Sequence, residues 1–235
     1  MTPEEVVFGQ ESAAHYEGWY RTPEGRRADG LEKASLSRLL EGLRGARSVL
    51  EVGAGTGHFA RWLREQGLAS VGLDLSAPML VRAQDLDGVP LVRGDACHLP
   101  FADGAFDLVA MVTTLEFLEC PREALAEALR VAREGLLLGV LNRWSAMGLQ
   151  RRLKSLFRRT IHDTARFYSV RALKRVLRAV GGGAGHIVWH TTLFPRGWPC
   201  TRANLPWGAF IATAISCQSQ RRGDDRGRHP NDLLG

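Results

Sequence analysis

The residues best suited to chemistry are glycines and carboxylates that follow short apolar runs. Gly53, Gly55 and Gly57 come directly after one such run. Asp74 and Asp95 each follow a later run. Glycine lets a ligand approach the backbone closely and adopts a positive φ without steric cost, and the helix expected next offers unpaired N–H groups. A carboxylate such as Asp74 can accept hydrogen bonds from both hydroxyls of a ribose. This combination predicts a binding site for a nucleoside-containing ligand.

The spacing of the glycines bears on which ligand this is. A dinucleotide-binding fold requires G-x-G-x-x-G, whereas this chain has G-x-G-x-G with His58 at the sixth position. An NAD-type oxidoreductase is therefore the alternative and not the first choice. Taken alone, Asp74 could be a helix N-cap or a solvated loop residue, and Asp95 could belong to an Asx turn. The prediction depends on the ordered set of glycines and carboxylates.

The elements that must position these residues alternate along the chain. Apolar runs predict strands, and apolar residues at helical spacing predict helices. Strands are expected at 47–52, 70–75, 89–93, 106–112, 135–141, 186–194 and 209–217, and helices at 31–43, 59–66, 78–86, 121–133, 149–159 and 171–180. This alternation indicates a parallel sheet covered on both faces. Ligands bind such sheets beyond the carboxyl ends of the strands.

Three segments in order resemble the motifs of a known family. They are VLEVGAGTG at 49–57, LDLS at 73–76 and GDACHLPFADGAFDLVAMVTTLEF at 94–117. They resemble the class I S-adenosylmethionine-dependent methyltransferases, in particular the type 11 small-molecule group, which includes quinone-biosynthesis C-methyltransferases. Residues 14–25 resemble the N-terminal lid of that group, and residues 167–182 resemble the helix before its last two strands. One departure is Arg133-Glu134-Gly135, where the family usually has Pro-Gly-Gly.

The resemblance implies a fold and a domain plan. The fold is α/β and Rossmann-like, a seven-stranded, mostly parallel sheet of order 3-2-1-4-5-7-6 with strand 7 antiparallel and helices on both faces. The expected plan is an N-terminal lid at 1–30, a methyltransferase domain at 31–217 with a helical cap at about 142–168, and a disordered tail at 218–235.

By the same resemblance, the cofactor is S-adenosyl-L-methionine. Glu51 and the glycines would line its methionine part, Asp74 would take the ribose hydroxyls, and Asp95 the adenine amino group. Thr113 would lie below the sulfonium, and aromatic residues of the lid would close over the cofactor. The cofactor-binding residues predicted in this way are Glu51, Gly53, Ala54, Gly55, Asp74, Leu75, Asp95, Ala96, Thr113, Tyr16 and Tyr20.

Methyl transfer is an in-line displacement at an activated carbon, so positioning can supply much of the acceleration. A protein base is needed only when the acceptor has a proton to lose. His58 and Glu116 are the catalytic candidates, although His58 could be an exposed helix residue and Glu116 a helix cap. His15, Tyr16 and Tyr20 are further candidates for the base. No metal site is expected, because the cysteines and histidines lack ligand spacing.

The charge of the chain is unevenly distributed. The formal net charge is +6, but residues 1–140 are acidic overall and residues 141–190 are strongly basic. The basic helices could simply have solvated faces. Alternatively, Arg143, Trp144, Arg166 and Tyr168 could bind the acceptor, and the first helix could rest on anionic lipid. Nucleic-acid binding ranks last, because the cofactor half is acidic and shows no RNA-binding motif.

The expected function is S-adenosylmethionine-dependent methyl transfer to a small molecule of anionic, aromatic or lipophilic character. The chain lacks an [N/D]-P-P-[Y/F] motif after the fourth strand, which weighs against nucleobase amines. A non-catalytic module that binds RNA or a protein is the second alternative. Widely spaced cysteines and the absence of an apolar run of about 20 residues favour a cytoplasmic protein with reduced thiols and no membrane-spanning segment. The oligomeric state stays open.

Overall fold

The computed structural model describes residues 10–43, 45–86, 89–144, 166–181, 185–195, 197 and 202–217. The helix expected at 149–159, most of the expected cap at 142–168 and the expected tail at 218–235 lie outside these residues. No helix in these ranges is long and apolar enough to cross a membrane.

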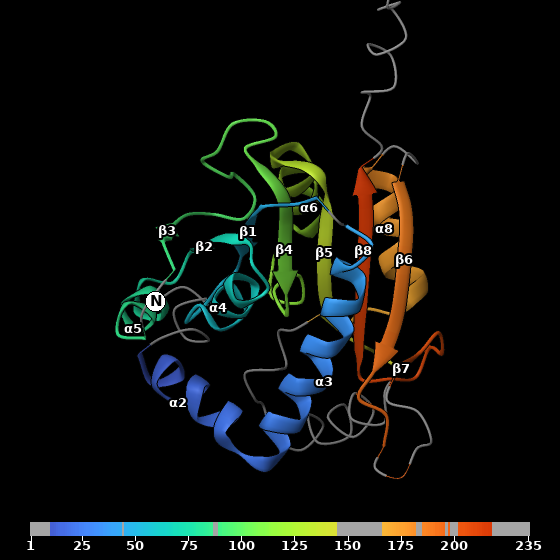
Figure 1. Cartoon of the computed structure of the whole chain (residues 1–235), viewed down its shortest axis with the longest axis horizontal. Coiled ribbons are helices and arrows are strands. Elements are labelled where there is room, and N and C mark those ends of the chain that lie inside the picture. Colours follow the sequence, from blue (N-terminus) through green and yellow to red (C-terminus); the bar gives the residue numbers. More distant parts are fainter. Residues whose placement is uncertain are drawn as a thin grey trace, which may run out of the picture.

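A single mixed sheet forms the centre of the molecule (Figure 1). Its strands are β1 (Ser48–Val52), β2 (Ala69–Asp74), β3 (Leu91–Arg93), β4 (Phe106–Val112), β5 (Ala132–Leu141), β6 (Gly185–Thr192), β7 (Arg202–Ala203) and β8 (Phe210–Cys217). Their spatial order is β3-β2-β1-β4-β5-β8-β6-β7. The first five strands are mutually parallel, and β8 is antiparallel to both β5 and β6. Without the two-residue β7, this is the predicted order 3-2-1-4-5-7-6 with an antiparallel seventh strand, so the predicted fold is confirmed.

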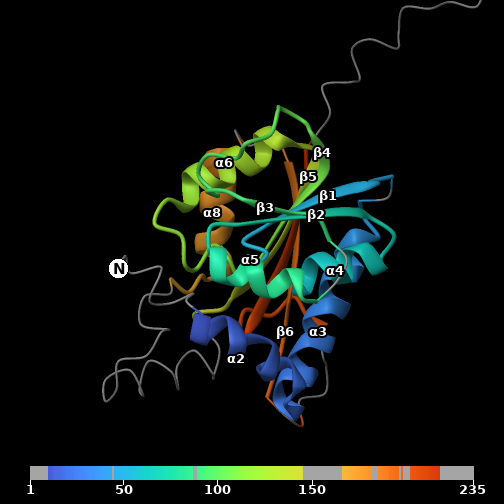
Figure 2. The ribbon, with the colours of Figure 1, turned by 90° about the vertical axis from the view of Figure 1, so that its left-hand side faces the viewer.

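Helices cover both faces of the sheet (Figure 2). They are α2 (Gln10–Arg21), α3 (Pro23–Leu40), α4 (His58–Glu65), α5 (Ala77–Gln84), α6 (Pro121–Val131) and α8 (Val170–Val180). On one face, α6 and α8 pack through residues such as Leu125 and Leu173. On the other face, α3 and α4 pack through residues such as Leu36 and Leu63. The central strands are buried on both sides, which explains why they form continuous apolar runs in the sequence.

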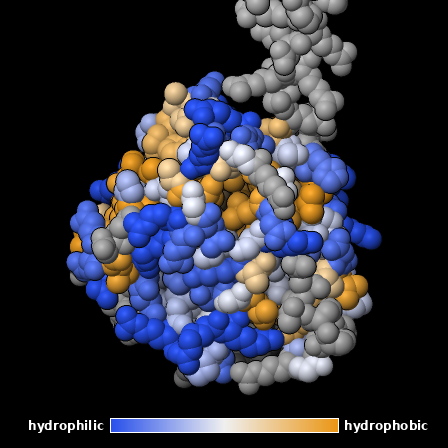
Figure 3. Space-filling model, in the orientation of Figure 1, coloured by the Kyte–Doolittle hydropathy of each residue, from blue (hydrophilic) through white to orange (hydrophobic). Residues whose placement is uncertain are grey.

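The helix α3 begins earlier than its apolar pattern predicts. Thr22 is its N-cap and accepts a hydrogen bond from the Gly25 N–H, and Pro23 occupies the first turn, where a proline loses nothing. The helix then runs without interruption through Gly30, the last residue of the expected lid. Its outward side and α2 form a mostly hydrophilic region at the lower left of Figure 3. The division into lid and domain at residue 30 stays a prediction.

The departure from the family pattern lies before β5. Helix α6 ends at Val131, and β5 begins at the next residue and includes Arg133. The pairing of β4 with β5 shifts register between Phe106 and Leu108. The usual turn is thus replaced by an early strand start, at the end of the strands opposite to the glycines.

Candidate functional site

The turn between β1 and α4 consists of glycines with positive φ. The φ angles are 74° at Gly53, 55° at Gly55 and 76° at Gly57. A Cβ added at Gly53 would lie 2.3 Å from the Thr114 side chain, whereas one at Gly55 would meet nothing within 4 Å. The turn is therefore in close contact with the residues after β4 at Gly53, whereas the space beside Gly55 is free of protein atoms.

Asp74 links the end of β2 to this turn. Its Oδ2 accepts a hydrogen bond from the Gly55 N–H at 2.7 Å, and its Oδ1 accepts one from the Ser76 N–H at 2.8 Å. Burial raises the pKa of Asp74, and these N–H groups oppose the shift. Each carboxylate oxygen keeps a further acceptor position, so Asp74 can still bind hydroxyls. The neighbouring Leu75 is 45% exposed. An exposed apolar side chain at this position can pack against a bound ligand.

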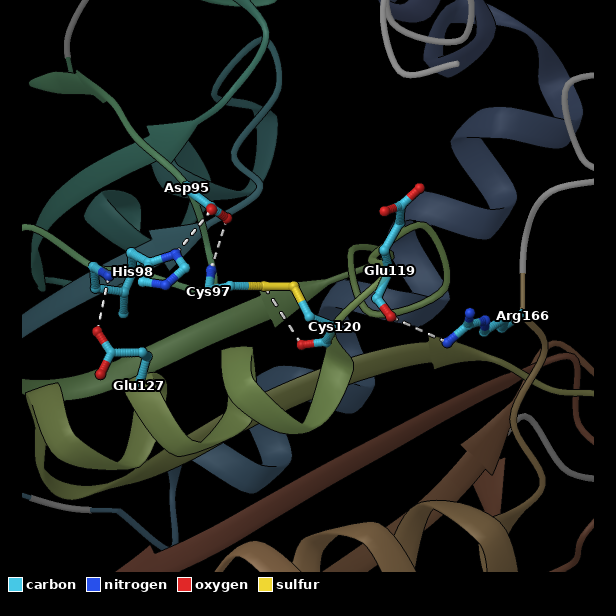
Figure 4. Close-up of a disulfide and its surroundings, with 8 residues drawn as sticks. Asp95, Cys97, His98, Glu119, Cys120, Glu127 and Arg166 are labelled. Atoms are coloured by element: carbon cyan, nitrogen blue, oxygen red, sulfur yellow. Dashed lines mark hydrogen bonds and ion pairs between the residues drawn. A yellow bond between two sulfur atoms is a disulfide. The ribbon is translucent and has the colours of Figure 1, made fainter. Parts of the chain in front are cut away.

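Asp95 follows β3 and lies at the surface of the next loop (Figure 4). Its Oδ1 accepts a hydrogen bond from the Cys97 N–H at 2.8 Å, and its Oδ2 lies 3.1 Å from His98 Nδ1. The Cys97 N–H is the main reason that the pKa of Asp95 is lowered. Asp95 thus forms the Asx-type turn that the sequence left open as an alternative. Its side chain is 47% exposed, so it also remains accessible to a ligand, and Ala96 beside it is buried.

The same loop corrects the expectation about the cysteines. Cys97 and Cys120 form a disulfide with their Cα atoms 6.5 Å apart (Figure 4). The expectation that all four cysteines are reduced thiols is wrong for this pair. The loop after β3 packs against α6, where the Leu99 N–H donates to Glu127, so residues 23 positions apart meet. Cys217 is a free thiol.

Two carboxyl groups are buried at the carboxyl ends of β1 and β4. Glu51 is 1% exposed and Glu116 is 0% exposed. Glu116 accepts a hydrogen bond from the Leu141 N–H through Oε1. Among the described residues, neither Glu51 Oε2 nor Glu116 Oε2 has a partner. Burial raises the pKa of Glu51 well above its usual range and that of Glu116 to about 7.

A third buried carboxyl group, Glu32, was missed by the sequence reasoning. It lies on the inward face of α3 with Ala28 and Leu36 and is 5% exposed. Burial, and to a smaller extent the charges of Asp29 and Glu116, raise its pKa to about 8. A signal was available, because Glu32 occupies the same helical face as apolar residues four positions away on either side.

Helix α2 docks onto the glycine turn through Glu17, a residue that the sequence reasoning also missed. Glu17 Oε1 accepts a hydrogen bond from the Thr56 hydroxyl and pairs with Arg61 Nη2 at 3.2 Å. Helix α2 also contacts α3 and α5. The residues expected to form a lid therefore lie against the glycine turn, where a lid would have to act.

The lid tyrosines and His58 form one cluster. The hydroxyl groups of Tyr16 and Tyr20 are 3.1 Å apart, and Tyr20 stacks on His58 with ring centroids 3.7 Å apart. His58 Nε2 lies 2.7 Å from Asp29 Oδ1. His58 thus contacts Asp29 through one ring nitrogen and stacks on Tyr20 with one face of its ring. The side chain of His15 lies outside the described part of the structure.

Thr113 adopts a rare backbone conformation at the end of β4. Its φ is 52°, in a region that costs a non-glycine residue about 1–2 kcal/mol. Its N–H donates to the Gly139 carbonyl at 2.7 Å, and the next hydroxyl, that of Thr114, donates to the Val52 carbonyl at 3.1 Å. Such strain persists where neighbouring contacts hold it, and it is common at functional positions.

Of the four residues expected to bind the acceptor, Arg166 contacts Glu116, and Arg143 contacts Tyr168. The Arg166 N–H donates to the Glu116 carbonyl at 2.7 Å, and the Arg143 N–H donates to the Tyr168 carbonyl at 2.8 Å. Tyr168 is buried, whereas Trp144 is 63% exposed with the Arg143 guanidinium 5.9 Å from its ring centroid. Within the described ranges, no group of three or more His, Cys, Asp or Glu residues could hold a metal ion.

Comparisons with known proteins agree with this geometry. The profile of a family described as a methyltransferase domain matches residues 50–138. The demethylmenaquinone methyltransferase of Renibacterium salmoninarum is 43% identical over 91 residues, covering 37% of this chain and 37% of that protein. The malonyl-[acyl-carrier protein] O-methyltransferase of Geobacter sulfurreducens is 36% identical over 148 residues, covering 58% of this chain and 54% of that protein. The chain thus spans less than two thirds of the length of these relatives.

Solved structures extend the likeness to most of the chain. A Thermotoga maritima methyltransferase, described as a possible histamine N-methyltransferase, has 28% identity and a TM-score of 0.75, covering 91% of this chain and 99% of that one. The magnesium protoporphyrin IX methyltransferase of Synechocystis, solved with bound S-adenosylhomocysteine, has a TM-score of 0.66 over 90% of this chain and 96% of that one, but at 15% identity it attests the fold alone. Residues 50–138 therefore match a methyltransferase domain, and the described fold is the class I, Rossmann-like fold of S-adenosylmethionine-dependent methyltransferases.

Proposed function

We propose that the chain transfers the methyl group of S-adenosylmethionine to a small-molecule acceptor. The observation that supports this best is the arrangement at the carboxyl ends of β1 and β2. There an open glycine turn is held by Asp74 through the Gly55 N–H, and Asp95 follows on the adjoining strand. The named relatives act on different acceptors, so none of those acceptors is carried over to this chain.

The described residues fit this cofactor. The open space at Gly55 leaves room for a ligand against the backbone, and the unpartnered oxygen of Glu51 can accept a hydrogen bond from an ammonium group. Asp74 and Leu75 would hold the ribose and one face of the adenine, and Asp95 the adenine amino group. Ala54, Ala96 and Thr113 would complete the site. When bound, the cofactor supplies a methyl group already activated by its sulfonium.

The residues of this chain would bind and orient the cofactor and the acceptor, and would exclude water from the site. In this proposal the lid helix α2, docked by Glu17, covers the site with Tyr16 and Tyr20, since displacing water strengthens the electrostatic interactions inside. Of the two candidate bases, we favour Glu116, because its Oε2 has no partner among the described residues and its pKa of about 7 suits proton transfer at neutral pH. In this proposal His58 positions the lid, because Asp29 and Tyr20 already engage it.

The partners and the location are also proposals. The acceptor would enter beside Arg143, Trp144, Arg166 and Tyr168, with nucleic acid disfavoured and transient contact with a membrane surface left open. We place the protein in the cytoplasm. In that reducing compartment the Cys97–Cys120 bond would be open to reduction, so the oxidation state of this pair in cell extracts tests the location.

Three measurements test the proposed function and its alternative. Calorimetry with S-adenosylhomocysteine should show binding, and its absence would reject the proposal. A screen of cell extract with radiolabelled S-adenosylmethionine, followed by mass identification of the labelled product, should then give the acceptor. An NADH fluorescence titration distinguishes the oxidoreductase alternative from the proposed function. That alternative requires that the protein bind NADH and not S-adenosylhomocysteine.

A further inference from the structure

The disulfide joins two loops that border the candidate site (Figure 4). Cys97 belongs to the loop after β3, two residues beyond Asp95, and Cys120 ends the loop after β4. The first loop carries the carboxylate expected to hold the adenine amino group. The second loop begins with Thr113, the position expected below the sulfonium. The bond therefore links two loops that would contact the same ligand.

The Cys120 side of the bond has a firm support. Cys120 is the N-cap of α6, a helix that packs into the core through residues such as Leu125. In the loop before it, the Glu116 carbonyl accepts the Arg166 backbone N–H at 2.7 Å. The Glu119 carbonyl accepts a guanidinium N–H of the same arginine at 3.4 Å (Figure 4). These contacts do not involve the disulfide, so they hold Cys120 in place whether or not the bond exists.

The turn around Cys97 depends more on the bond. Asp95 Oδ1 accepts the Cys97 N–H at 2.8 Å, and the His98 N–H donates to the Asp95 carbonyl at 3.1 Å. These hydrogen bonds shape the turn from within. The burial of Cys97 and its bond to Cys120 tie the turn to the start of α6. Opening the disulfide removes the covalent tie and loosens the turn that orients the Asp95 carboxylate.

The two ends of the same loop have other supports. The Leu99 N–H donates to Glu127 at 2.8 Å, and Arg130 donates to the Leu99 carbonyl at 3.1 Å. At the beginning of the loop, the Gly94 N–H donates to the Asp74 carbonyl at 3.0 Å. We therefore expect the reduced chain to stay folded, with the change concentrated on the turn between these supports.

The pair is placed so that an external thiol can open it. Cys97 is 7% exposed, whereas Cys120 is only partly buried, so attack is expected at the Cys120 sulfur. Cys120 also stands at the N-terminus of an eleven-residue helix. The unpaired N–H groups of a helix start stabilise a thiolate, which favours release of this sulfur in a later exchange step.

We infer that Cys97 and Cys120 form a thiol–disulfide exchange site for a low-molecular-weight dithiol, and that the oxidised pair is the state that binds S-adenosylmethionine tightly. The inference rests on the proposed function, because it assigns Asp95 to the adenine. With the bond closed, the turn is ordered before the ligand arrives, so binding costs less conformational entropy.

The exchange balances as a two-electron reaction. One thiolate of the dithiol attacks the Cys120 sulfur, the disulfide breaks, and Cys97 leaves with the bonding electron pair and takes up a proton. The second thiolate of the dithiol then attacks the sulfur that the dithiol placed on Cys120. This step forms the cyclic disulfide of the reagent and releases Cys120. The dithiol is oxidised, and its two protons end on the two cysteines or in solvent.

The test uses the full chain and dithiothreitol as the dithiol. Calorimetry measures the affinity for S-adenosylhomocysteine in the oxidised and the reduced chain, and mass spectrometry after alkylation verifies each state. We expect reduction to weaken binding about tenfold, the scale of a weakened hydrogen bond to a charged group, while circular dichroism shows a folded chain. Equal affinity in the two states, a pair that cannot be cycled between them, or unfolding of the reduced chain overturns the inference. Failure of both states to bind S-adenosylhomocysteine instead overturns the proposed function itself.

Three variants assign the effect. Cys97→Ser should bind as weakly as the reduced chain and should not respond to dithiothreitol. Asp95→Ala should bind weakly in both redox states, and its affinity should change less than about twofold between them, because the contact that the turn orients is missing. Cys217→Ser removes the free thiol at the end of β8 and is the matched control, which should keep the full response. A tenfold response in Asp95→Ala, or its loss in Cys217→Ser, contradicts the assignment.

Discussion

The glycine turn allows a sharp prediction, because two of its glycines differ in what surrounds them. Replacing Gly53 with alanine places a Cβ at positive φ, which costs about 1–2 kcal/mol. That Cβ would also lie 2.3 Å from Thr114 Cγ2 and 2.5 Å from Oγ1. The Thr114 hydroxyl is bonded to the carbonyls of Val52 and Val112, so the side chain cannot turn away freely. Overpacking of this kind adds about 1–3 kcal/mol.

Gly55→Ala is the matched control. Gly55 also has a positive φ, but no atom lies within 4 Å of its added Cβ. Gly53→Ala should therefore lower the free energy of unfolding by about 2–5 kcal/mol, and Gly55→Ala by only about 1–2 kcal/mol. Urea unfolding monitored by circular dichroism measures both. The binding of S-adenosylhomocysteine should show the opposite order, because the new methyl group at Gly55 occupies space that the ligand needs.

A double variant isolates the contact. Thr114→Ala removes the two atoms nearest to the added Cβ, so Gly53→Ala combined with Thr114→Ala should lose less stability than the two single changes summed. Equal destabilisation by Gly53→Ala and Gly55→Ala, or strict additivity in the double variant, would refute the reasoning.

Three further predictions concern single features of the site and its support. Asp74→Ala should weaken S-adenosylhomocysteine binding by about 1.5–3 kcal/mol, or roughly 10- to 150-fold, as measured by calorimetry, because charged hydrogen bonds are lost; unchanged affinity would exclude its ribose role. Reducing the Cys97–Cys120 disulfide, which closes a 23-residue separation, should cost about 3 kcal/mol of unfolding free energy in urea, and Cys97→Ser should abolish this sensitivity to reductant. Asp107 has a lowered pKa, chiefly because it accepts the Arg47 N–H, so its stabilisation is complete above the unfolded pKa near 4 and is lost as pH falls through the folded value. Asp107→Asn should therefore flatten the loss of stability between about pH 5 and pH 2, and an unchanged slope would contradict this.

Much of the fold follows from local signals in the sequence. The buried strands β1 and β4 form continuous apolar runs, and the glycines mark the turn after β1. Capping residues such as Ser76 and Ser169 begin α5 and α8. These features are visible in the sequence because each depends on neighbours within a few positions.

The features that were missed depend on distant neighbours or on broken patterns. Helix α3 was predicted only from residue 31, because Gly25, Gly30 and the charges between them interrupt the apolar period of its first turns. The disulfide joins loops that follow β3 and β4, and only the folded chain brings them together. The commitment of His58 to the lid depends on Asp29 and Tyr20, which belong to helices that the sequence did not resolve at these positions.

The charge distribution shows that the position of a charge decides how strongly it acts at the candidate site. The basic residues after 140 suggested an anionic acceptor, but Arg143 and Arg166 are exposed, where water and salt screen a charge strongly. Glu32 and Glu116 contribute only two of the 25 acidic residues, yet both are buried, where a charge acts on its neighbours with much less screening. The net charge of the chain therefore says less about the candidate site than the burial of each charged group does.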